Sequence, residues 1–151
     1  MSNDDFFIQS FVGEYKVEFT HDVWDKLSND VSSDTHVIID SNICELYKDK
    51  LIKILENKSV LIIDANENNK SLDKMPAYVE HLVSKNIKRN HKLIAIGGGI
   101  TQDITCFLSA TLLRGVDWIF YPTTLLAQAD SCIGSKSSIN CNGVKNILGT
   151  F

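Results

Sequence analysis

The chain contains 151 residues, of which 44% are hydrophobic and 23% are charged, with 8 glycines and 2 prolines. This composition is typical of one globular domain that is long enough to bury a sizeable core. The 15 basic and 19 acidic residues give a net charge of −4, so nucleic acid is not an expected partner. Apolar runs are too short to span a bilayer, and the acidic N-terminus does not resemble a signal peptide. We therefore expect a cytoplasmic protein without a membrane segment.

The cysteines and histidines show no metal-ligand spacing. The four cysteines form no Cys-x-x-Cys pair, and no histidine lies three to five residues from another. We expect reduced thiols and no zinc site among these residues.

Apolar periodicity predicts strands that alternate with helices. Residues 15–19 and 37–39 are the first expected strands, and Asn42 is the expected N-cap of a helix that extends to Leu55. The expected elements after it are a strand at 60–63, a helix after Pro76, a strand at 93–96, a helix at 104–112, a strand at 118–121, and a short helix capped by Thr123 or Thr124.

This alternation predicts an α/β fold with a Rossmann-like, mostly parallel sheet and helices on both faces. No repeat or internal linker interrupts the pattern, so residues 1–151 are expected to form one domain. Ligands of such sheets bind at the carboxyl ends of the strands. Asp40, 64–70, Gly97–Gly99 and 122–124 all follow expected strands.

The three glycines at 97–99 lie between an expected strand and an expected helix. Glycine lets the backbone approach a diphosphate closely, and the helix start offers free N–H groups. The dinucleotide fingerprint has a third glycine where Gln102 stands, so a tight turn without a ligand is the alternative. Asp103 is either a first-turn acid favoured by the helix dipole or an acceptor for a ligand hydroxyl.

A second polar region spans residues 122–136, where two hydroxyls, a carboxylate and an ammonium surround a short helix. Asn140, Lys145 and Asn146 follow it. Cations near a phosphate, with carboxylate and amide groups for hydroxyls, suit a phosphorylated polyol. Taken singly, Lys136 and Lys145 would be surface lysines, and only the spacing of the whole set favours a site.

These motifs together resemble the signature of the 3-dehydroquinate synthase family of sugar-phosphate cyclases. The resemblance is carried by Gly97-Gly98-Gly99-Ile-Thr-Gln-Asp103, Arg114-Gly115, Pro122-Thr-Thr-Leu-Leu-Ala-Gln-Ala-Asp130-Ser131, Gly134-Ser-Lys136 and Lys145-Asn146-Ile-Leu-Gly149. Further upstream, Asp40-Ser41-Asn42 and 66–70 fall where the family has its adenosine-side residues and its Gly-Glu-x-x-Lys loop.

The resemblance implies an enzyme of the shikimate pathway that converts 3-deoxy-arabino-heptulosonate 7-phosphate into 3-dehydroquinate and phosphate. NAD would act as a catalyst that is restored in each cycle, and a divalent metal, zinc or cobalt, would polarise the oxidised oxygen. The family's metal ligands lie in an all-helical second domain downstream of Lys145-Asn146. We therefore expect this chain to be the NAD-binding domain, without metal ligands, inactive alone, and part of a homodimer.

By position, the resemblance assigns two overlapping sets of residues. The substrate set is Asp130, Lys136 and Asn146, with Arg114 at a phosphate site that could belong to a neighbouring subunit. The cofactor set is Asp40, Asn42, Glu67, Lys70, Gly98, Gly99, Ile100, Thr101, Gln102, Asp103, Thr123, Thr124, Lys136 and Lys145.

The chain departs from the family pattern mainly at small spacer residues. Gln102 and Ser135 replace glycines, and Asn66 replaces the glycine before Glu67. One alternative is therefore a cyclase with a different product. The others are a polyol or glycerol-type NAD dehydrogenase of the same fold, and a nucleotide-binding module without catalysis.

Overall fold

A parallel sheet of four strands forms the centre of the computed structural model, which describes residues 5–10, 13–134 and 136–150. The strands are β1 (Phe6–Gln9), β2 (Glu14–Val17), β3 (Thr35–Asp40), β4 (Val60–Ile63), β5 (Lys92–Gly97), β6 (Asp117–Pro122), β7 (Ile139–Cys141) and β8 (Val144–Leu148). The helices are α1 (Val23–Asp30), α2 (Ser41–Leu46), α3 (Lys48–Leu55), α4 (Met75–Ser84), α5 (Gly99–Thr111) and α6 (Leu125–Ala129), with 3₁₀ turns η1 (Glu67–Asn69), η2 (Leu72–Lys74), η3 (Leu112–Arg114) and η4 (Ser131–Ile133).

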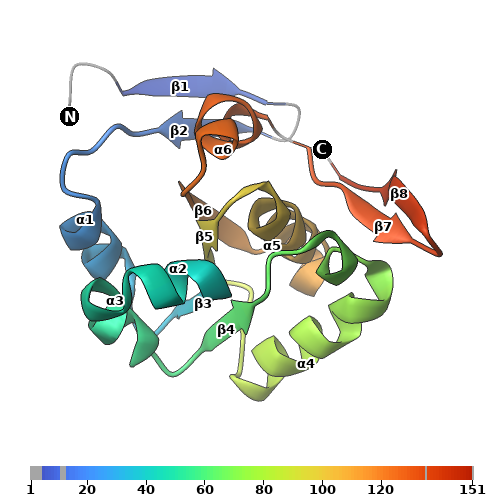
Figure 1. Cartoon of the computed structure of the whole chain (residues 1–151), viewed down its shortest axis with the longest axis horizontal. Helices are drawn as coiled ribbons and strands as arrows, with labels where there is room; N and C mark the ends of the chain where they lie inside the picture. The colour runs from blue at the N-terminus through green and yellow to red at the C-terminus, as the bar shows by residue number, and fades with distance from the viewer. Residues whose placement is uncertain (1–4, 11–12, 135, 151) are drawn as a thin grey trace.

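The sheet has the strand order β4-β3-β5-β6, and all three pairings are parallel. Val37 of β3 pairs with Val60 on one side and with Ile94 on the other. The four strands therefore end at one edge, where β3, β5 and β6 finish at Asp40, Gly97 and Pro122 (Figure 1). The predicted α/β fold with a mostly parallel sheet is confirmed.

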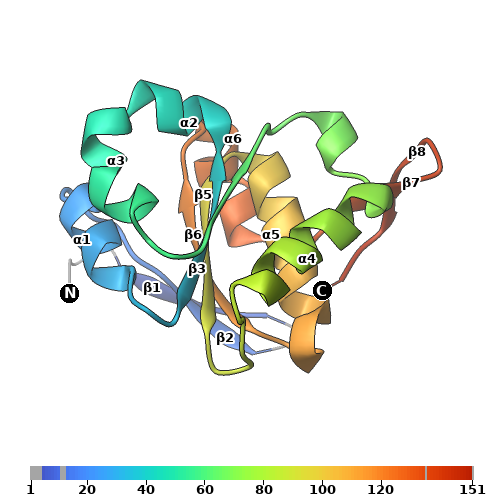
Figure 2. The same ribbon diagram turned by 90° about the horizontal axis from the view of Figure 1, so that it is seen from below.

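Helices cover both faces of this sheet, as Figure 2 shows. Ile38 packs on the side of α4 and α5, with Leu82 and Leu108 in the same core. Its neighbours Val37 and Ile39 face the opposite core, which α1 and α3 complete. Successive residues of a strand point to opposite faces, so a strand covered on both faces has a continuous apolar run.

Two details of the predicted helices are wrong. The helix expected up to Leu55 is divided into α2 and α3 at Tyr47, whose φ of −123° and ψ of 27° are not helical. Asp40, and not Asn42, is the N-cap of α2, because its carboxylate accepts the N–H of Asn42 at 2.9 Å. The cap at Thr124 is confirmed, since its hydroxyl oxygen accepts the N–H of Ala127.

Two antiparallel hairpins flank the sheet. The strand predicted at 15–19 ends at Val17 and pairs with β1, which the periodicity did not indicate. The β7–β8 hairpin turns at Asn142 and Gly143, where φ values of 50° and 76° suit a two-residue turn. It projects from the side of the sheet that α4 and α5 cover (Figures 1 and 2).

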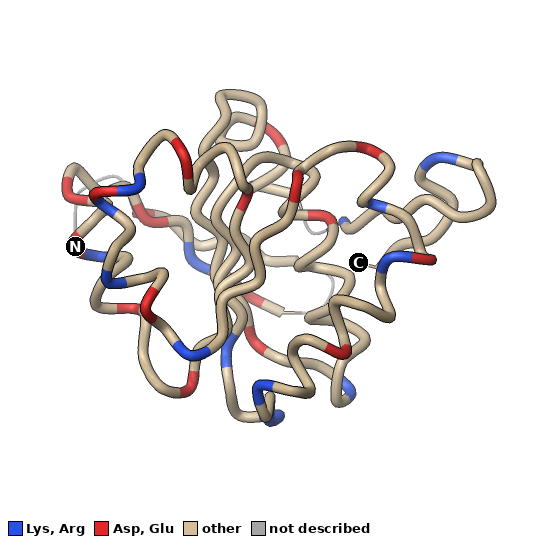
Figure 3. The backbone as a smooth tube through the Cα atoms, turned by 60° about the horizontal axis from the view of Figure 1, so that its bottom comes forward, with Lys and Arg blue, Asp and Glu red and all other residues tan. Residues whose placement is uncertain are grey.

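Lysine and arginine are interspersed with aspartate and glutamate over both helical layers (Figure 3). Within the described ranges, no helix has the length and apolar character needed to cross a membrane.

A histidine network lies at the amino end of β3, opposite the edge where the strands finish. The ring of His36 is 2% exposed, and its Nδ1 and Nε2 lie 2.7 Å from Ser59 Oγ and 2.9 Å from His91 Nδ1. Burial, followed by the charges of His91 and His81, lowers the pKa of His36 to about 4. His36 is therefore neutral in the folded chain at pH 7.

We expect this histidine to make stability fall on acidification. The unfolded chain takes up a proton on His36 near pH 6.5, whereas the folded chain does so only near pH 4. The free energy of unfolding should therefore decrease by about 2 kcal/mol between pH 7 and pH 5 through this group alone. Urea unfolding of His36→Gln should lack that part of the pH dependence, while the exposed-site control His21→Gln should keep it. Equal pH dependence in the two variants would contradict the prediction.

Candidate functional site

The turn between β5 and α5 is sterically crowded at Gly97 and Gly98 and accessible at Gly99. A Cβ at Gly97 would collide with the side chain of Thr101, which is fully buried. At Gly98 it would lie 3.1 Å from Thr124 Cγ2. At Gly99 the nearest described atom is Ser131 Oγ at 3.9 Å. The backbone can therefore be approached from outside at Gly99.

Gly98 is the N-cap of α5, and within the described chain no side chain caps this helix. The first N–H groups of a helix lack partners inside it and carry the positive end of the dipole. This 13-residue helix start thus fits an anionic group such as a diphosphate.

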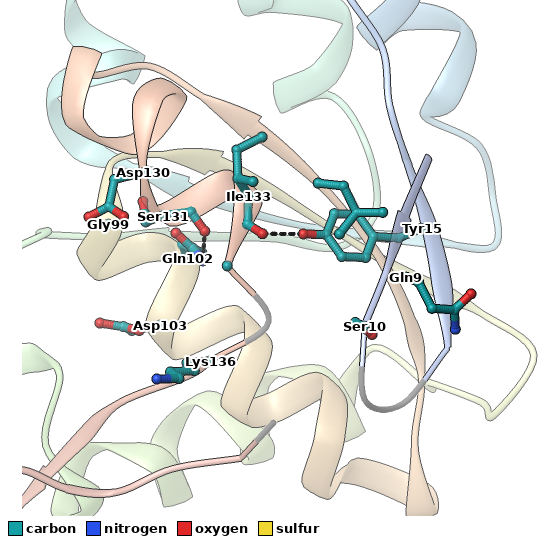
Figure 4. Close-up of a pocket in the computed structure, with 12 residues that line it drawn as sticks. Gln9, Ser10, Tyr15, Gly99, Gln102, Asp103, Asp130, Ser131, Ile133 and Lys136 are labelled. Carbon is teal, nitrogen blue, oxygen red and sulfur yellow. Dashed lines mark hydrogen bonds between the residues drawn. The ribbon is translucent and has the colours of Figure 1, made fainter. Parts of the chain in front are cut away.

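A cavity of about 530 Å³ lies beside Gly99. Three segments line it: the first turns of α5, the stretch around η4 and the β1–β2 hairpin (Figure 4). The lining residues are Ile8, Gln9, Ser10, Tyr15, Gly99, Gln102, Asp103, Asp130, Ser131, Ile133, Gly134 and Lys136. The volume is that of an ordinary small-molecule site, and the structure brings Gln102, Asp103, Asp130 and Lys136 to it together.

A buried ammonium group bonds to Asp103, which lines this cavity. Lys70 is 6% exposed, and its Nζ donates to Asp103 Oδ2 at 3.1 Å and to Asn146 Oδ1 at 3.0 Å. Glu67 Oε1 lies 3.7 Å from the same nitrogen. Four predicted site residues from three distant parts of the sequence are thus joined through one cation.

Asn140 completes the attachment of the β7–β8 hairpin. Its Nδ2 donates to Glu67 Oε1 at 2.8 Å, and its Oδ1 accepts the backbone N–H of Asn146 at 2.8 Å. On the other side, Asp103 Oδ1 accepts the N–H of Ser138 at 3.1 Å. The hairpin is therefore held to η1 and α5 by side chains that form the candidate site.

Burial and hydrogen bonding shift the two acids of this network in opposite directions. Burial raises the pKa of Asp103, although the hydrogen bond and charge of Lys70 act against that rise. The hydrogen bond from Asn140 lowers the pKa of Glu67, with further lowering by the charges of Lys70 and Lys145. The expectation that Asp103 is a first-turn acid of α5 is wrong; its carboxylate accepts from Lys70 and also lines the cavity.

Other predicted residues lie at the same sheet edge but outside the cavity lining. Asp40 Oδ1 accepts from the backbone and side-chain nitrogens of Asn42, and the N–H of Thr123 donates to the carbonyl of Gly97 at 2.9 Å. Thr124 is exposed beside Gly98. Lys145 is exposed on β8, Ile100 is half-buried, and Ser135 lies outside the described residues.

Arg114 does not join this cluster within the chain. It follows α5, whose 13 residues place it about 20 Å from Gly99. Arg114 is exposed. Leu113, Arg114 and Gly115 have consecutive positive φ values of 51°, 66° and 113°.

The sequence did not point to several residues of the site. Tyr15, whose hydroxyl donates to the carbonyl of Ile133, closes one side of the cavity, but only a strand pattern marked it. Ser131 stood next to Asp130 in a motif, and Ser138 contributes its N–H. Asn140 was named in the second polar cluster but was given no role of its own.

A family model described as "3-dehydroquinate synthase N-terminal" matches residues 60–151, which include the glycine turn, the cavity's η4 side and the hairpin. The chain belongs to the 3-dehydroquinate synthase family. Curated relatives include the 3-dehydroquinate synthase of Thermoanaerobacter sp. (strain X514), 38% identical over 91% of this chain and 41% of that protein. That of Staphylococcus haemolyticus (strain JCSC1435) is 40% identical over 91% of this chain and 40% of that protein. The chain thus spans about two fifths of the length of these relatives.

Solved cyclases share the fold. A 2-deoxy-scyllo-inosose synthase complexed with carbaglucose-6-phosphate, NAD⁺ and Co²⁺ superposes with a TM-score of 0.80 at 22% identity, over 97% of this chain and 43% of that one. ValA, a 2-epi-5-epi-valiolone synthase from Streptomyces hygroscopicus subsp. jinggangensis 5008 with NAD⁺ and Zn²⁺ bound, gives a TM-score of 0.68 at 28% identity, over 78% of this chain and 34% of that one.

Lys70 should matter for stability as well as for the site. Lys70→Met leaves the carboxylate of Asp103 partly buried without its cation, so we expect a loss of about 2 kcal/mol at pH 7. The loss should be smaller at lower pH. Without the lysine, the pKa of Asp103 is higher than in the unaltered chain, so its carboxylate is neutralised by protonation as the pH falls. Urea unfolding, with hydrogen exchange of the hairpin 139–148, measures both effects. The exposed-site control is Lys74→Met, and equal stability of the two variants would refute the role of Lys70.

Proposed function

We propose that this chain forms the NAD-binding domain of an enzyme that converts 3-deoxy-arabino-heptulosonate 7-phosphate into 3-dehydroquinate and phosphate. The observation that carries the proposal is the cavity where Asp103, Asp130 and Lys136 meet beside the open turn at Gly99. The family and the names of its curated relatives supply the reaction.

The residues fit a dinucleotide on structural grounds. The uncapped start of α5 and the open Gly99 fit the diphosphate, and buried polar atoms of Gln102 and Ser131 lack partners among the described residues. Asp40 and Asn42 would hold the adenosine side, whereas Thr123 and Thr124 would frame the pocket. Glu67, Lys70 and Lys145 would complete it from the hairpin side, and Gly98, Ile100 and Thr101 would shape the turn.

NAD, when bound, would supply reversible oxidation of a substrate hydroxyl. The protein's own side chains would bind and orient the sugar phosphate: Lys136 faces its anionic groups, and Asp130 and Asn146 accept from or donate to its hydroxyls and carboxylate. Arg114 would serve a phosphate site only in a neighbouring subunit of a homodimer, because it lies about 20 Å from Gly99 in its own chain.

We assign no metal to the described side chains of this chain. Among the described residues, no group of three or more His, Cys, Asp or Glu side chains could hold one. The proposal therefore assigns no step of this chain's residues to a metal, and zinc or cobalt would be held by other parts of the enzyme.

A second candidate is a sugar-phosphate cyclase with another product. It is favoured by Gln102, whose buried side chain occupies the cavity wall where the family resemblance has glycine.

Release of phosphate from the heptulosonate phosphate without net NADH supports the first function. Release from glucose 6-phosphate alone supports the second, net NADH indicates a dehydrogenase, and no turnover by the enzyme containing this chain indicates a binding module.

NAD binding tests the glycine turn directly. Gly99→Val places a Cβ no closer than 3.9 Å to Ser131 Oγ at the start of α5, so the fold should survive while a diphosphate loses its approach. We expect the dissociation constant for NAD, measured by isothermal titration calorimetry, to rise at least about tenfold. Ala110→Val, at an exposed position of the same helix, should bind NAD as the unaltered chain does. Unchanged affinity in the Gly99 variant would contradict the assignment.

Turnover tests the cavity. In the enzyme that contains this chain, Lys136→Ala should lower the rate of phosphate release more than about tenfold, because it removes a lysine that lines the cavity proposed for the anionic substrate. Lys88→Ala, at an exposed position of the loop that precedes β5, is the control. Near-normal turnover of the Lys136 variant would remove this residue from the site.

A further inference from the structure

Two buried polar atoms on the cavity wall lack hydrogen-bond partners within the described ranges. They are Gln102 Oε1 on α5 and Ser131 Oγ on η4. Gln102 is 3% exposed, so solvent does not satisfy its side chain. A buried acceptor without a partner is costly and rare in folded proteins, and it commonly marks a place where a ligand supplies the missing group.

The orientation of the Gln102 amide follows from its other contact. Its Nε2 donates to the backbone carbonyl of Ser131 at 2.7 Å. A carbonyl can only accept, so the nitrogen must face Ser131 and the amide oxygen must face away from it. Figure 4 shows the two side chains next to each other beside Gly99. Gln102 therefore offers an acceptor, and the Ser131 hydroxyl offers both a donor and an acceptor.

A sugar hydroxyl matches this pair. One hydroxyl can donate to Gln102 Oε1 and at the same time accept from Ser131 Oγ, whereas a phosphate oxygen has no proton to donate. The rest of the wall agrees, since the carboxylates of Asp103 and Asp130 are further acceptors and Lys136 supplies a cation. This lining suits an anionic ligand that carries several hydroxyls.

We propose that Gln102 and Ser131 together bind one sugar hydroxyl of the ligand and so help to determine which sugar the site accepts. The inference rests on the proposed function and deepens it. Gln102 is a specificity residue here because its buried amide oxygen is an acceptor that a glycine at this position would not supply. The hydroxyl belongs either to the ribose beside the nicotinamide of NAD or to the sugar phosphate, and the two sources need separate probes.

Ser131→Ala is the cleanest variant. It deletes a hydroxyl that has no hydrogen-bond partner among the residues that the structure describes, and it keeps the carbonyl that holds Gln102. Without ligand, this variant should unfold at the same or a higher urea concentration than the unaltered chain. Gln102→Met is the second variant, and Gln128→Met is its control, because Gln128 also donates to a backbone carbonyl but is exposed and outside the cavity lining.

Titration calorimetry with ADP, ADP-ribose and the heptulosonate phosphate in the presence of NAD tests the inference. Both variants should bind ADP normally, because ADP lacks the second ribose. A rise of about tenfold in the dissociation constant for ADP-ribose assigns the hydroxyl to the cofactor, and the same rise for the heptulosonate phosphate alone assigns it to the substrate. Unchanged binding of all three probes by both variants overturns the inference, as would equal losses with Gln128→Met. Failure of the unaltered chain to bind any probe overturns the proposed function itself, and the inference with it.

Discussion

The buried ammonium of Lys70 joins segments of this molecule that are far apart in the sequence. It lies where η1, the second turn of α5 and the β7–β8 hairpin meet, and it bonds Asp103 and Asn146 at once. A lysine that is 6% exposed is tolerated only when acceptors surround it, so the three segments must keep their relative positions. Ile139 and Leu148 of the hairpin pack with the core on the α4 and α5 side, and this polar junction is a second attachment.

The parallel sheet explains why the junction and the cavity lie side by side. Because β3, β5 and β6 all end at one edge, the segments that follow them gather there without long connections. Asp103 takes part in both features, with its carboxylate bonded to Lys70 and its side chain on the cavity wall. A change in the charge of Asp103 would therefore affect both the ligand site and the attachment of the hairpin.

The sequence predicted the sheet well, because parallel strands that are covered on both faces produce continuous apolar runs. The runs at 37–39, 60–63, 93–96 and 118–121 are the cores of β3 to β6. The two hairpins were not predicted, since β1 is mostly exposed and β7 has only three residues. The turn residues Asn142-Gly143 did carry a hairpin signal. The break at Tyr47 has no marker of the kind that glycine or proline would give.

The candidate site was predicted in part for similar reasons. Motif spacing could indicate that Glu67, Lys70, Asp103 and Asn146 belong together, but it could not show that they bond one another. The unpaired oxygen of Gln102 is likewise a property of three-dimensional packing, because it depends on where the carbonyl of Ser131 lies. Arg114 shows the converse, since a motif residue lies far from the others within its own chain.

The histidine network and the ligand site occupy opposite ends of β3 and β5, yet both act on the same folding equilibrium. Acid weakens the sheet at its amino end through His36, whereas any molecule held at the carboxyl end adds its binding free energy to the folded state. Occupancy of the cavity would therefore shift acid unfolding to lower pH without a single contact to a histidine. Protonation of His36 and ligand binding both change the free energy of unfolding of the same chain, so the two ends of the strands are linked thermodynamically.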